Sequence, residues 1–176
     1  MKQLIRSNDM NVNVIDFNPV FERLNHELAA IDQSLKVICV GGYVMQLHGY
    51  RGTADIDAFF QTNKAIENAI RKVGDEFDIN SPLELWLNNS VSNKNPIPPP
   101  QHYEVILKFS NLTVAKIDIT YLIGMKLYSG REQDLQDVAT ILKDNIYEQP
   151  LELLSKLKAI GFNLDVSVVL DAFEQT

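Results

Sequence analysis

Two aspartates separated by one residue, Asp55 and Asp57, are the side chains of this sequence best suited to bind a metal ion. Residues two apart on a strand point to the same side, so a strand here would carry both carboxylates on one face. Such a pair repels itself unless a cation lies between the acids, and its hard oxygen atoms favour Mg²⁺ or Mn²⁺. We therefore predict a divalent metal site here; the alternative is an ordinary strand face whose acids are solvated.

Two glycines, Gly41 and Gly42, lie upstream of this pair, between an apolar run and a short helical pattern. Glycine lets the backbone approach a phosphate closely, and the N–H groups at the start of a helix are free to bind an anion. These positions are therefore predicted to bind phosphates, although a tight turn is the ordinary explanation of a Gly-Gly pair.

Arg51 and Thr53 stand immediately before the aspartate pair. The guanidinium of Arg51 could pair with a phosphate or hold Asp55 in place. The hydroxyl of Thr53 could orient the loop that leads into the pair. Each of these signals is weak by itself, and their order along the chain is more specific than any one of them.

The spacing of apolar residues predicts the elements that position these side chains. Apolar residues at steps of three and four predict helices at 18–33, 43–48, 150–160 and 165–173. A further helix is predicted from a cap at Thr62 or Asn63 to residue 77, and another at 121–143 with a break at Gly130. Strands are predicted at 36–40, 55–60, 103–109 and 112–119, the last two joined by a two-residue turn. Residues 81–90 fit a helix or an irregular segment, and 88–100, with four prolines, is predicted to be a long functional or mobile loop.

This order of elements predicts an α+β protein with a small mixed β-sheet flanked by helices and a helical extension at the C-terminus. We expect residues 1–120 to form the core and residues 121–176 to form the extension, packed on the core as one compact unit. A chain of 176 residues, 45% of them hydrophobic, has the size and composition of one globular domain.

Charge and apolar pattern exclude several classes of protein. The net charge of −7 argues against a large nucleic-acid interface, yet residues 91–131 carry five basic side chains against two acidic ones, which suits the binding of a nucleotide.

Cys39 is the only cysteine, which excludes a disulfide framework, and its apolar neighbours predict that it is buried. No stretch approaches the roughly 18 apolar residues of a membrane span, and the segment with Lys2 and Arg6 lacks the apolar centre of a signal peptide. We expect a soluble, cytoplasmic protein without a membrane partner.

Two stretches resemble the DNA polymerase β-like nucleotidyltransferase superfamily, above all its small bacterial branches with AbiEii-type toxin nucleotidyltransferases. The first is VICVGGYVMQLHGYRGTADIDAFF, residues 37–60, with Gly-Gly followed by Arg-x-Thr-x-Asp-x-Asp. The second is YLIGMKLYSGREQDLQDVATIL, residues 121–142, with Lys126 on one helix and an arginine and two aspartates on the next. The resemblance implies a nucleotidyltransferase fold, and the two stretches cover about a quarter of the chain.

The resemblance also implies roles for individual residues. The implied nucleotide-binding residues are Gly41, Gly42, Arg51, Thr53, Lys126 and Arg131. The implied metal ligands are Asp55, Asp57 and Asp118, which with Lys126 would be the catalytic residues. Asp134 and Asp137, three apart on one side of a helix, would hold Lys126 or Arg131 in place. The alternative for this group is a salt-bridge network between two helices.

Asp118 is the candidate for the third metal ligand that many members of the superfamily take from a later strand. If the turn at 110–111 sets the hairpin register, Lys116 and Asp118 share a face with Tyr103, a face that is otherwise apolar. An acid and a base at its open end suggest either a metal ligand or a Lys116–Asp118 ion pair. Turnover depends on whether Asp118 completes the site.

Together the residues and the resemblance predict an enzyme that uses a nucleoside triphosphate and Mg²⁺ or Mn²⁺ to transfer a nucleoside monophosphate to an acceptor hydroxyl. The acceptor would be an RNA such as tRNA, a protein or a small molecule. For tRNA, the basic residues between Lys94 and Arg131 would have to form one surface beside the aspartates. The resemblance suggests a toxin–antitoxin setting, with an antitoxin as partner. The alternative is a catalytically inactive module of the same fold that binds a nucleotide or a protein partner.

Overall fold

The computed structural model describes residues 14–176, so the stretch with Lys2 and Arg6 lies outside the described residues. The helices are α1 (Asn18–Ala30), α2 (Gly41–Leu47), α3 (Lys64–Glu76), α4 (Ile119–Ser129), α5 (Glu132–Leu142), α6 (Pro150–Ala159) and α7 (Val166–Glu174). The strands are β1 (Leu35–Cys39), β2 (Ile56–Phe59), β3 (Leu87–Asn88), β4 (Tyr103–Lys108) and β5 (Leu112–Ile117). Two short 3₁₀ helices, η1 (Ser90–Asn93) and η2 (Pro100–His102), lie between β3 and β4. These elements confirm the predicted α+β class.

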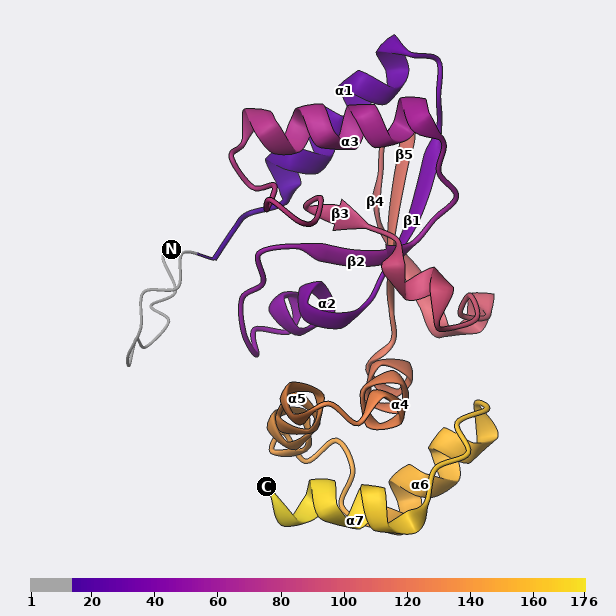
Figure 1. Ribbon diagram of the computed structural model, residues 1–176. Coiled ribbons are helices and arrows are strands. Elements are labelled where there is room, and N and C mark those ends of the chain that lie inside the picture. Colours follow the sequence, from indigo (N-terminus) through magenta and orange to yellow (C-terminus); the bar gives the residue numbers. More distant parts are fainter. Residues whose placement is uncertain (1–13) are drawn as a thin grey trace, which may run out of the picture.

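The strands form one mixed sheet in the order β3-β2-β1-β5-β4, with β1 at its centre (Figure 1). β1 is antiparallel to β2 and parallel to β5, so that Val37 lies opposite Val114. β4 and β5 form the predicted hairpin, and the short β3 extends the sheet beyond β2. The segment that contains Gly41 therefore leaves the sheet from its central strand, between the strand of Asp57 and β5.

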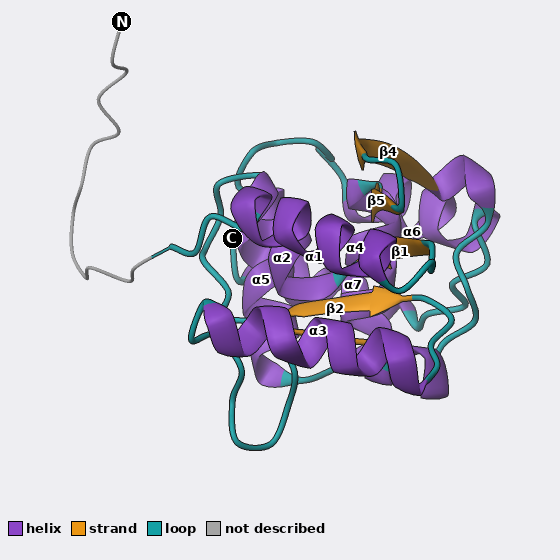
Figure 2. Ribbon diagram, turned by 90° about the horizontal axis from the view of Figure 1, so that it is seen from above, coloured by secondary structure: helices purple, strands orange, loops and turns teal. Residues whose placement is uncertain are grey.

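Each face of the sheet buries its own apolar cluster because successive residues of β1 point to opposite sides. Val37 and Cys39 pack with α1 and α3, and the expected burial of Cys39 is confirmed. Ile38 and Val40 pack with residues of α2, α4, α5, α6 and α7. Figure 1 shows α1 and α3 gathered on one side and the other helices on the opposite side, and in the view from above α3 lies on the near side of β2 (Figure 2).

Side-chain caps fix where three helices begin. Asn63 Oδ1 accepts from Ile66 N at 3.0 Å, which confirms Asn63 as the cap of α3. Asp118 Oδ1 accepts from Tyr121 N at 2.7 Å at the start of α4, and Asp165 caps α7 in the same way. Such caps satisfy backbone donors that a helix leaves free at its N-terminus. Asp118 thus lies after the end of β5, although the sequence placed it inside a strand that runs to residue 119.

The hairpin register differs from the prediction. Near the turn Leu107 lies opposite Val114, as a two-residue turn requires, but further along Glu104 lies opposite Lys116. A β-bulge between Val105 and Leu107 inserts one residue of β4 and shifts the remaining pairs by one position. The prediction that Lys116 shares a face with Tyr103 is therefore wrong, because a one-residue shift moves every later side chain to the opposite face.

The segment between α3 and β4 is irregular but anchored at its start. Trp86 is fully buried, and its indole Nε1 donates to the carbonyl of Ile70 in α3 at 2.9 Å. The following β3 pairs in parallel with β2, and Asn88 lies opposite Asp57. The proline-rich loop therefore departs from a point beside the predicted metal pair.

The C-terminal helices α4 to α7 pack below the sheet in Figure 1 and share one buried cluster with it. The predicted division at residues 120 and 121 falls in the first turn of α4. Among the described residues, no helix combines the length and the apolar character that crossing a membrane requires.

Candidate functional site

Asp57 lies in β2 at the edge of a cavity, and its carboxyl is half-buried. The main chain holds it firmly, since Val40 N donates to the carbonyl of Asp57 at 2.9 Å. Burial raises the pKa of Asp57 above its ordinary value, and the nearby charge of Asp55 raises it further. A cation bound beside both carboxylates would relieve this unfavourable charge, which is the behaviour expected of a metal-binding pair.

Asp55 lies one residue before β2, so the strand begins later than the sequence suggested. Thr53 Oγ1 is 3.0 Å from the carbonyl oxygen of Asp55 and 3.2 Å from its Oδ1. The main chain of Thr53 in turn donates to Gln46 Oε1 of α2 at 2.9 Å. The hydroxyl of Thr53 thus has the loop-orienting position expected from the sequence.

The two glycines at the start of α2 pack directly against the acidic segment. Gly41 has a φ of +59°, which side chains disfavour, and a Cβ added there would lie 3.4 Å from Asp57 Oδ2. At Gly42 an added Cβ would lie 2.7 Å from Thr53 Oγ1 and 3.3 Å from Arg51 Nη1. The glycines therefore allow the start of α2 and the acidic segment to approach more closely than any other residues would.

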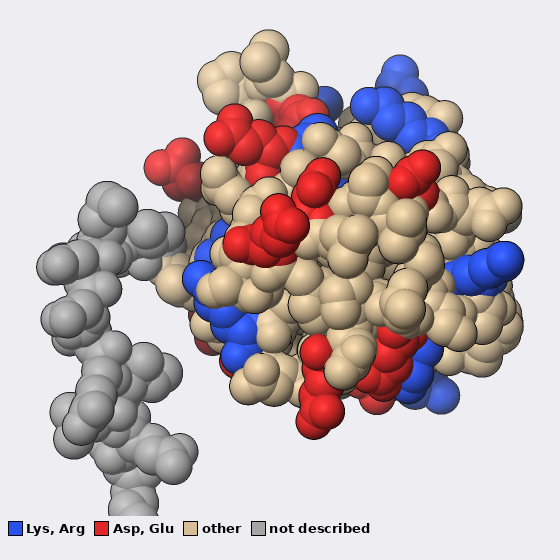
Figure 3. All heavy atoms as spheres, turned by 90° about the horizontal axis from the view of Figure 1, so that it is seen from below, with Lys and Arg blue, Asp and Glu red and all other residues tan. Residues whose placement is uncertain are grey.

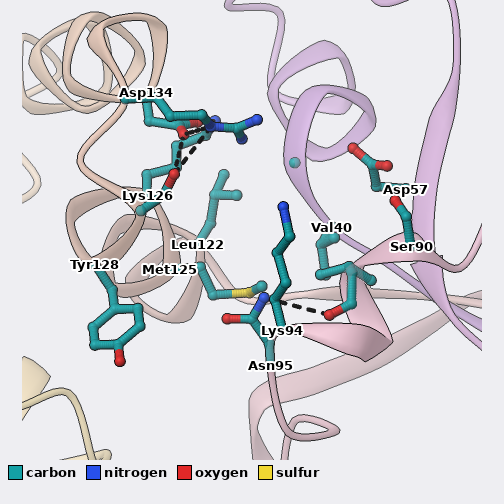
Figure 4. Close-up of a pocket in the computed structure, with 14 residues that line it drawn as sticks. Val40, Asp57, Ser90, Lys94, Asn95, Leu122, Met125, Lys126, Tyr128 and Asp134 are labelled. Atoms are coloured by element: carbon teal, nitrogen blue, oxygen red, sulfur yellow. Dashed lines mark hydrogen bonds and ion pairs between the residues drawn. The ribbon is translucent and has the colours of Figure 1, made fainter.

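A cavity of about 440 Å³ opens beside Asp57, between β2, the proline-rich loop and α4 (Figure 4). Its volume falls in the range of small-molecule sites. Five predicted site residues line it: Gly41, Asp57, Lys126, Arg131 and Asp134. The remaining lining residues are Val40, Ser90, Val91, Lys94, Asn95, Leu122, Met125, Tyr128 and Ser129. The structure thus brings the two sequence stretches, 37–60 and 121–142, to opposite walls of one cavity.

Lys126 of α4 lies between two carboxylates of α5. Its Nζ is 2.9 Å from Asp134 Oδ1 and 2.7 Å from Asp137 Oδ2, and all three side chains are at most 5% exposed. Two charge-assisted hydrogen bonds therefore fix the ammonium group at the cavity wall. The contact fits both interpretations of the sequence, an aspartate of α5 that holds Lys126 and a salt-bridge network between the two helices.

Two arginines complete the network. Arg51 binds Asp137 through two parallel hydrogen bonds of 2.8 Å, and Arg131 Nε is 2.7 Å from Asp134 Oδ2. Of the alternatives for Arg51, a clamp on Asp55 is wrong, because the guanidinium binds Asp137 instead. Burial would raise the pKa of Asp137, but the hydrogen bonds from Arg51 and Lys126 outweigh it and lower that pKa to about 2. The pKa of Asp134 is lowered in the same way, against burial, by Lys126 and Arg131.

Asp118 is not part of this arrangement. Its Oδ2 is 2.9 Å from His102 Nδ1 and its Oδ1 caps α4, and it lines neither this cavity nor the second one described below. The alternative of a Lys116–Asp118 ion pair is wrong, since Lys116 Nζ is 2.7 Å from Glu104 Oε1. The bulge in β4 explains this, because it places Glu104 directly opposite Lys116. None of the contacts among residues 14–176 joins Asp118 to the aspartate pair, and its role as a ligand stays a prediction.

The wall formed by the proline-rich loop was not predicted as part of the site. Ser90, Lys94 and Asn95 come from it, and Asn88 Nδ2 is buried next to the strand of Asp57 without a hydrogen-bond partner among the described residues. The signal for this wall was the unusual length and composition of 88–100. A second cavity of about 440 Å³ adjoins the first, is lined by the same loop and the α6–α7 turn, and shares Lys94, Asn95, Met125 and Tyr128 with it.

The basic residues between Lys94 and Arg131 do not form one surface. Lys94, Lys126 and Arg131 gather at the cavity, whereas Lys116 is paired with Glu104 and Lys108 lies near the hairpin turn. The face that Figure 3 shows, seen from below, is mostly uncharged and carries scattered acidic and basic groups, without one continuous basic patch. The condition set for a tRNA acceptor, one basic surface beside the aspartates, is therefore not met, since only three of the five basic residues lie at the cavity.

The donor set suits a small divalent cation. Asp55 and Asp57 offer hard carboxylate oxygens, while among residues 14–176 no three His, Cys, Asp or Glu side chains converge as a metal cluster. Mg²⁺ commonly takes one or two protein carboxylates and completes its shell with water and substrate phosphates. The pair therefore fits a metal that binds together with a nucleotide.

Comparison with known proteins identifies the family of the chain. No curated protein and no solved structure matches the chain significantly. A family model described as a nucleotidyltransferase of unknown function (DUF6036) matches residues 16–167, which includes the whole sheet, both walls of the cavity and the ion-pair network. The chain therefore belongs to the DUF6036 family of nucleotidyltransferases.

Proposed function

We propose that the protein transfers a nucleoside monophosphate from a nucleoside triphosphate to an acceptor hydroxyl, with Mg²⁺ or Mn²⁺ bound by Asp55 and Asp57. The observation that carries the proposal is the convergence of Gly41, Asp57 and a cationic wall on one cavity. A metal–triphosphate complex needs room beside the backbone, acids that bind the metal and cations that face the phosphates. The glycine supplies the room, and Asp57, whose pKa is raised by burial and by Asp55, is an acid that a metal would stabilise in its charged form.

The transfer makes and breaks one bond at the α-phosphorus. The acceptor oxygen forms a bond to this atom, the bond to the oxygen bridging the α- and β-phosphates breaks, and pyrophosphate leaves with that oxygen. The hydroxyl proton passes to solvent water. The bound metal would neutralise phosphate charge and lower the pKa of the acceptor hydroxyl.

The residues of this chain would bind and orient the substrate. Gly41, which lines the cavity, would leave room for phosphate oxygens beside Asp57. Gly42 would let the start of α2 pack against Thr53, and Thr53 would hold the loop that presents Asp55. The network of Lys126 with Asp134 and Asp137 would fix α4 against α5, and Arg51, which binds Asp137, would hold the acidic segment to these helices.

The acceptor is proposed as an RNA, a protein side chain or a small molecule with a free hydroxyl. The likeness of residues 37–60 and 121–142 to AbiEii-type toxins supports a role in a toxin–antitoxin pair, in which an antitoxin would be the partner. Among RNAs, a tRNA would have to reach the site with its end alone, because the flanking basic residues are dispersed.

A second candidate function is favoured by the place of Asp118. Because Asp118 caps α4 and contacts His102, the proposed site would have two acidic ligands where many relatives in the superfamily use three. A nucleotidyltransferase-fold module that binds a nucleotide or a protein partner without turnover is consistent with such a site.

Binding and transfer measurements separate these candidates. Calorimetry with each of the four nucleoside triphosphates and Mg²⁺ would compare the native protein with Asp55→Ala/Asp57→Ala and with Asp171→Asn, an exposed control on α7. We expect the double variant alone to lose binding; equal binding by all three proteins would remove the metal site from consideration. Incubation of α-labelled triphosphate with lysate RNA and protein would then test transfer, and binding without any transfer under either metal would favour the inactive module.

A further inference from the structure

The cations that line the cavity differ in whether a carboxylate already neutralises them. Lys126 contacts Asp134 and Asp137, and Arg131 contacts Asp134. Lys94 lines the same cavity, and no carboxylate lies within 4 Å of its ammonium group among the described residues. An anionic ligand would therefore meet Lys94 as a cation whose charge is not yet compensated.

The loop that carries Lys94 is fixed to the acidic pair. Asn88 pairs with Asp57 across β2 and β3, and Asn89 Nδ2 donates to the carbonyl of Phe60 at 3.3 Å. The turn of η1 follows, and the main-chain nitrogens of Lys94 and Asn95 both donate to the carbonyl of Val91, at 3.2 and 3.1 Å. The loop that carries Lys94 is thus anchored to the strand that carries Asp57.

The side chain of Lys94 points into the cavity. Figure 4 shows it extending from the loop into the space between the wall of Asp57 and the wall of Lys126 and Asp134. Lys126, in contrast, is 5% exposed and directs its ammonium to the two aspartates. Breaking those bonds to reach a phosphate would leave two buried carboxylates with less compensation, which is costly.

We propose that Lys94 of the proline-rich loop, and not Lys126, is the lysine that binds the substrate triphosphate. This inference rests on the proposed function and deepens it, because it assigns the phosphate contact to a residue outside both stretches that resemble known nucleotidyltransferases. Lys126 keeps a structural role in the cavity wall. The loop then contributes to substrate binding, and Lys94 lies on the solvent-exposed side where an entering triphosphate meets it first.

The test compares Lys94→Ala with Lys108→Ala, an exposed lysine of β4 outside both cavities. Calorimetry would use the Mg²⁺ complex of whichever of the four triphosphates binds the native protein most tightly, and the corresponding nucleoside without phosphates. We expect Lys94→Ala to weaken triphosphate binding about tenfold or more and to leave nucleoside binding unchanged, because only phosphate contacts are lost. Lys94→Arg should retain most of the affinity, and Lys108→Ala all of it.

The outcomes separate the inference from the proposed function. If the native protein binds a triphosphate and Lys94→Ala binds it within twofold as tightly, the assignment of Lys94 is wrong while the proposed function stands. Equal losses for the triphosphate and the nucleoside would also overturn it, since they would indicate a distorted cavity. If the native protein binds none of the four triphosphates with Mg²⁺ or Mn²⁺, the proposed function and this inference both fall.

Discussion

Replacing Lys126 by methionine tests the ion-pair network at its centre. The substitution keeps most of the volume of the side chain and removes the charge between Asp134 and Asp137. Breaking a buried ion pair on one side typically costs about 3–5 kcal/mol of unfolding free energy. Because Asp137 keeps its two hydrogen bonds to Arg51 and Asp134 keeps Arg131, we expect a loss at the lower end, about 3 kcal/mol.

Urea unfolding measures this loss directly. Trp86 is the only tryptophan and is fully buried in the opposite cluster from Lys126, so its fluorescence reports unfolding of the core. The control is Lys158→Met on α6, an exposed lysine, which should change the unfolding free energy by less than about 0.5 kcal/mol. A Lys126→Met protein as stable as this control would refute the reasoning, because it would show that the two carboxylates do not depend on the ammonium.

Three further predictions follow from the same geometry. Gly41→Ala and Gly49→Ala both place a side chain at positive φ and should each cost about 1 kcal/mol, but only Gly41→Ala should weaken Mg²⁺-triphosphate binding in calorimetry, since Gly49 has no atom within 4 Å of an added Cβ. The pKa of Asp137 is lowered from 3.8 to about 2 against the effect of burial, so the ionised carboxylate contributes roughly 2 kcal/mol to the unfolding free energy. This contribution is complete above about pH 4 and is lost as the pH falls from about 4 towards 2. Urea unfolding of Asp137→Asn should lack this part of the pH dependence. Asp55→Asn should lower the raised pKa of Asp57, although burial will keep part of the shift; a carbon-detected NMR titration in which the pKa of Asp57 does not move would contradict their coupling.

Much of the fold was predictable because its signals are local. Apolar periodicity located the helices and four strands, and the capping residue of α3 followed from a single asparagine. The approach of the glycines to the acidic segment was predictable for the same reason, because their order along one short stretch already implies that they meet. It is visible at Gly41, where an added Cβ would lie 3.4 Å from Asp57 Oδ2.

The remaining features depend on contacts that the sequence does not encode locally. The bulge in β4 places the residues before it, including Glu104, on the face opposite to the one predicted. Nothing in the alternation of that strand marks where the extra residue lies. The pairing of Arg51 with Asp137 joins residues 86 positions apart. Lys94 reaches the cavity because the proline-rich loop is anchored to β2 through Asn88. An irregular loop has no periodicity from which the direction of its side chains could be predicted.

The parallel pairing of β1 with β5 has a consequence for how the chain folds. Leu35 lies opposite Leu112, 77 positions later, so the central pair of the sheet cannot form until most of the chain is available. Closing so long a loop carries an entropic cost before any contact is gained, and non-local pairing of this kind slows folding. On the ribosome, β1 and β2 can pair early, but the other edge of β1 must wait exposed until β5 emerges. We expect this edge to be the part of a nascent or truncated chain most prone to wrong pairing with other strands.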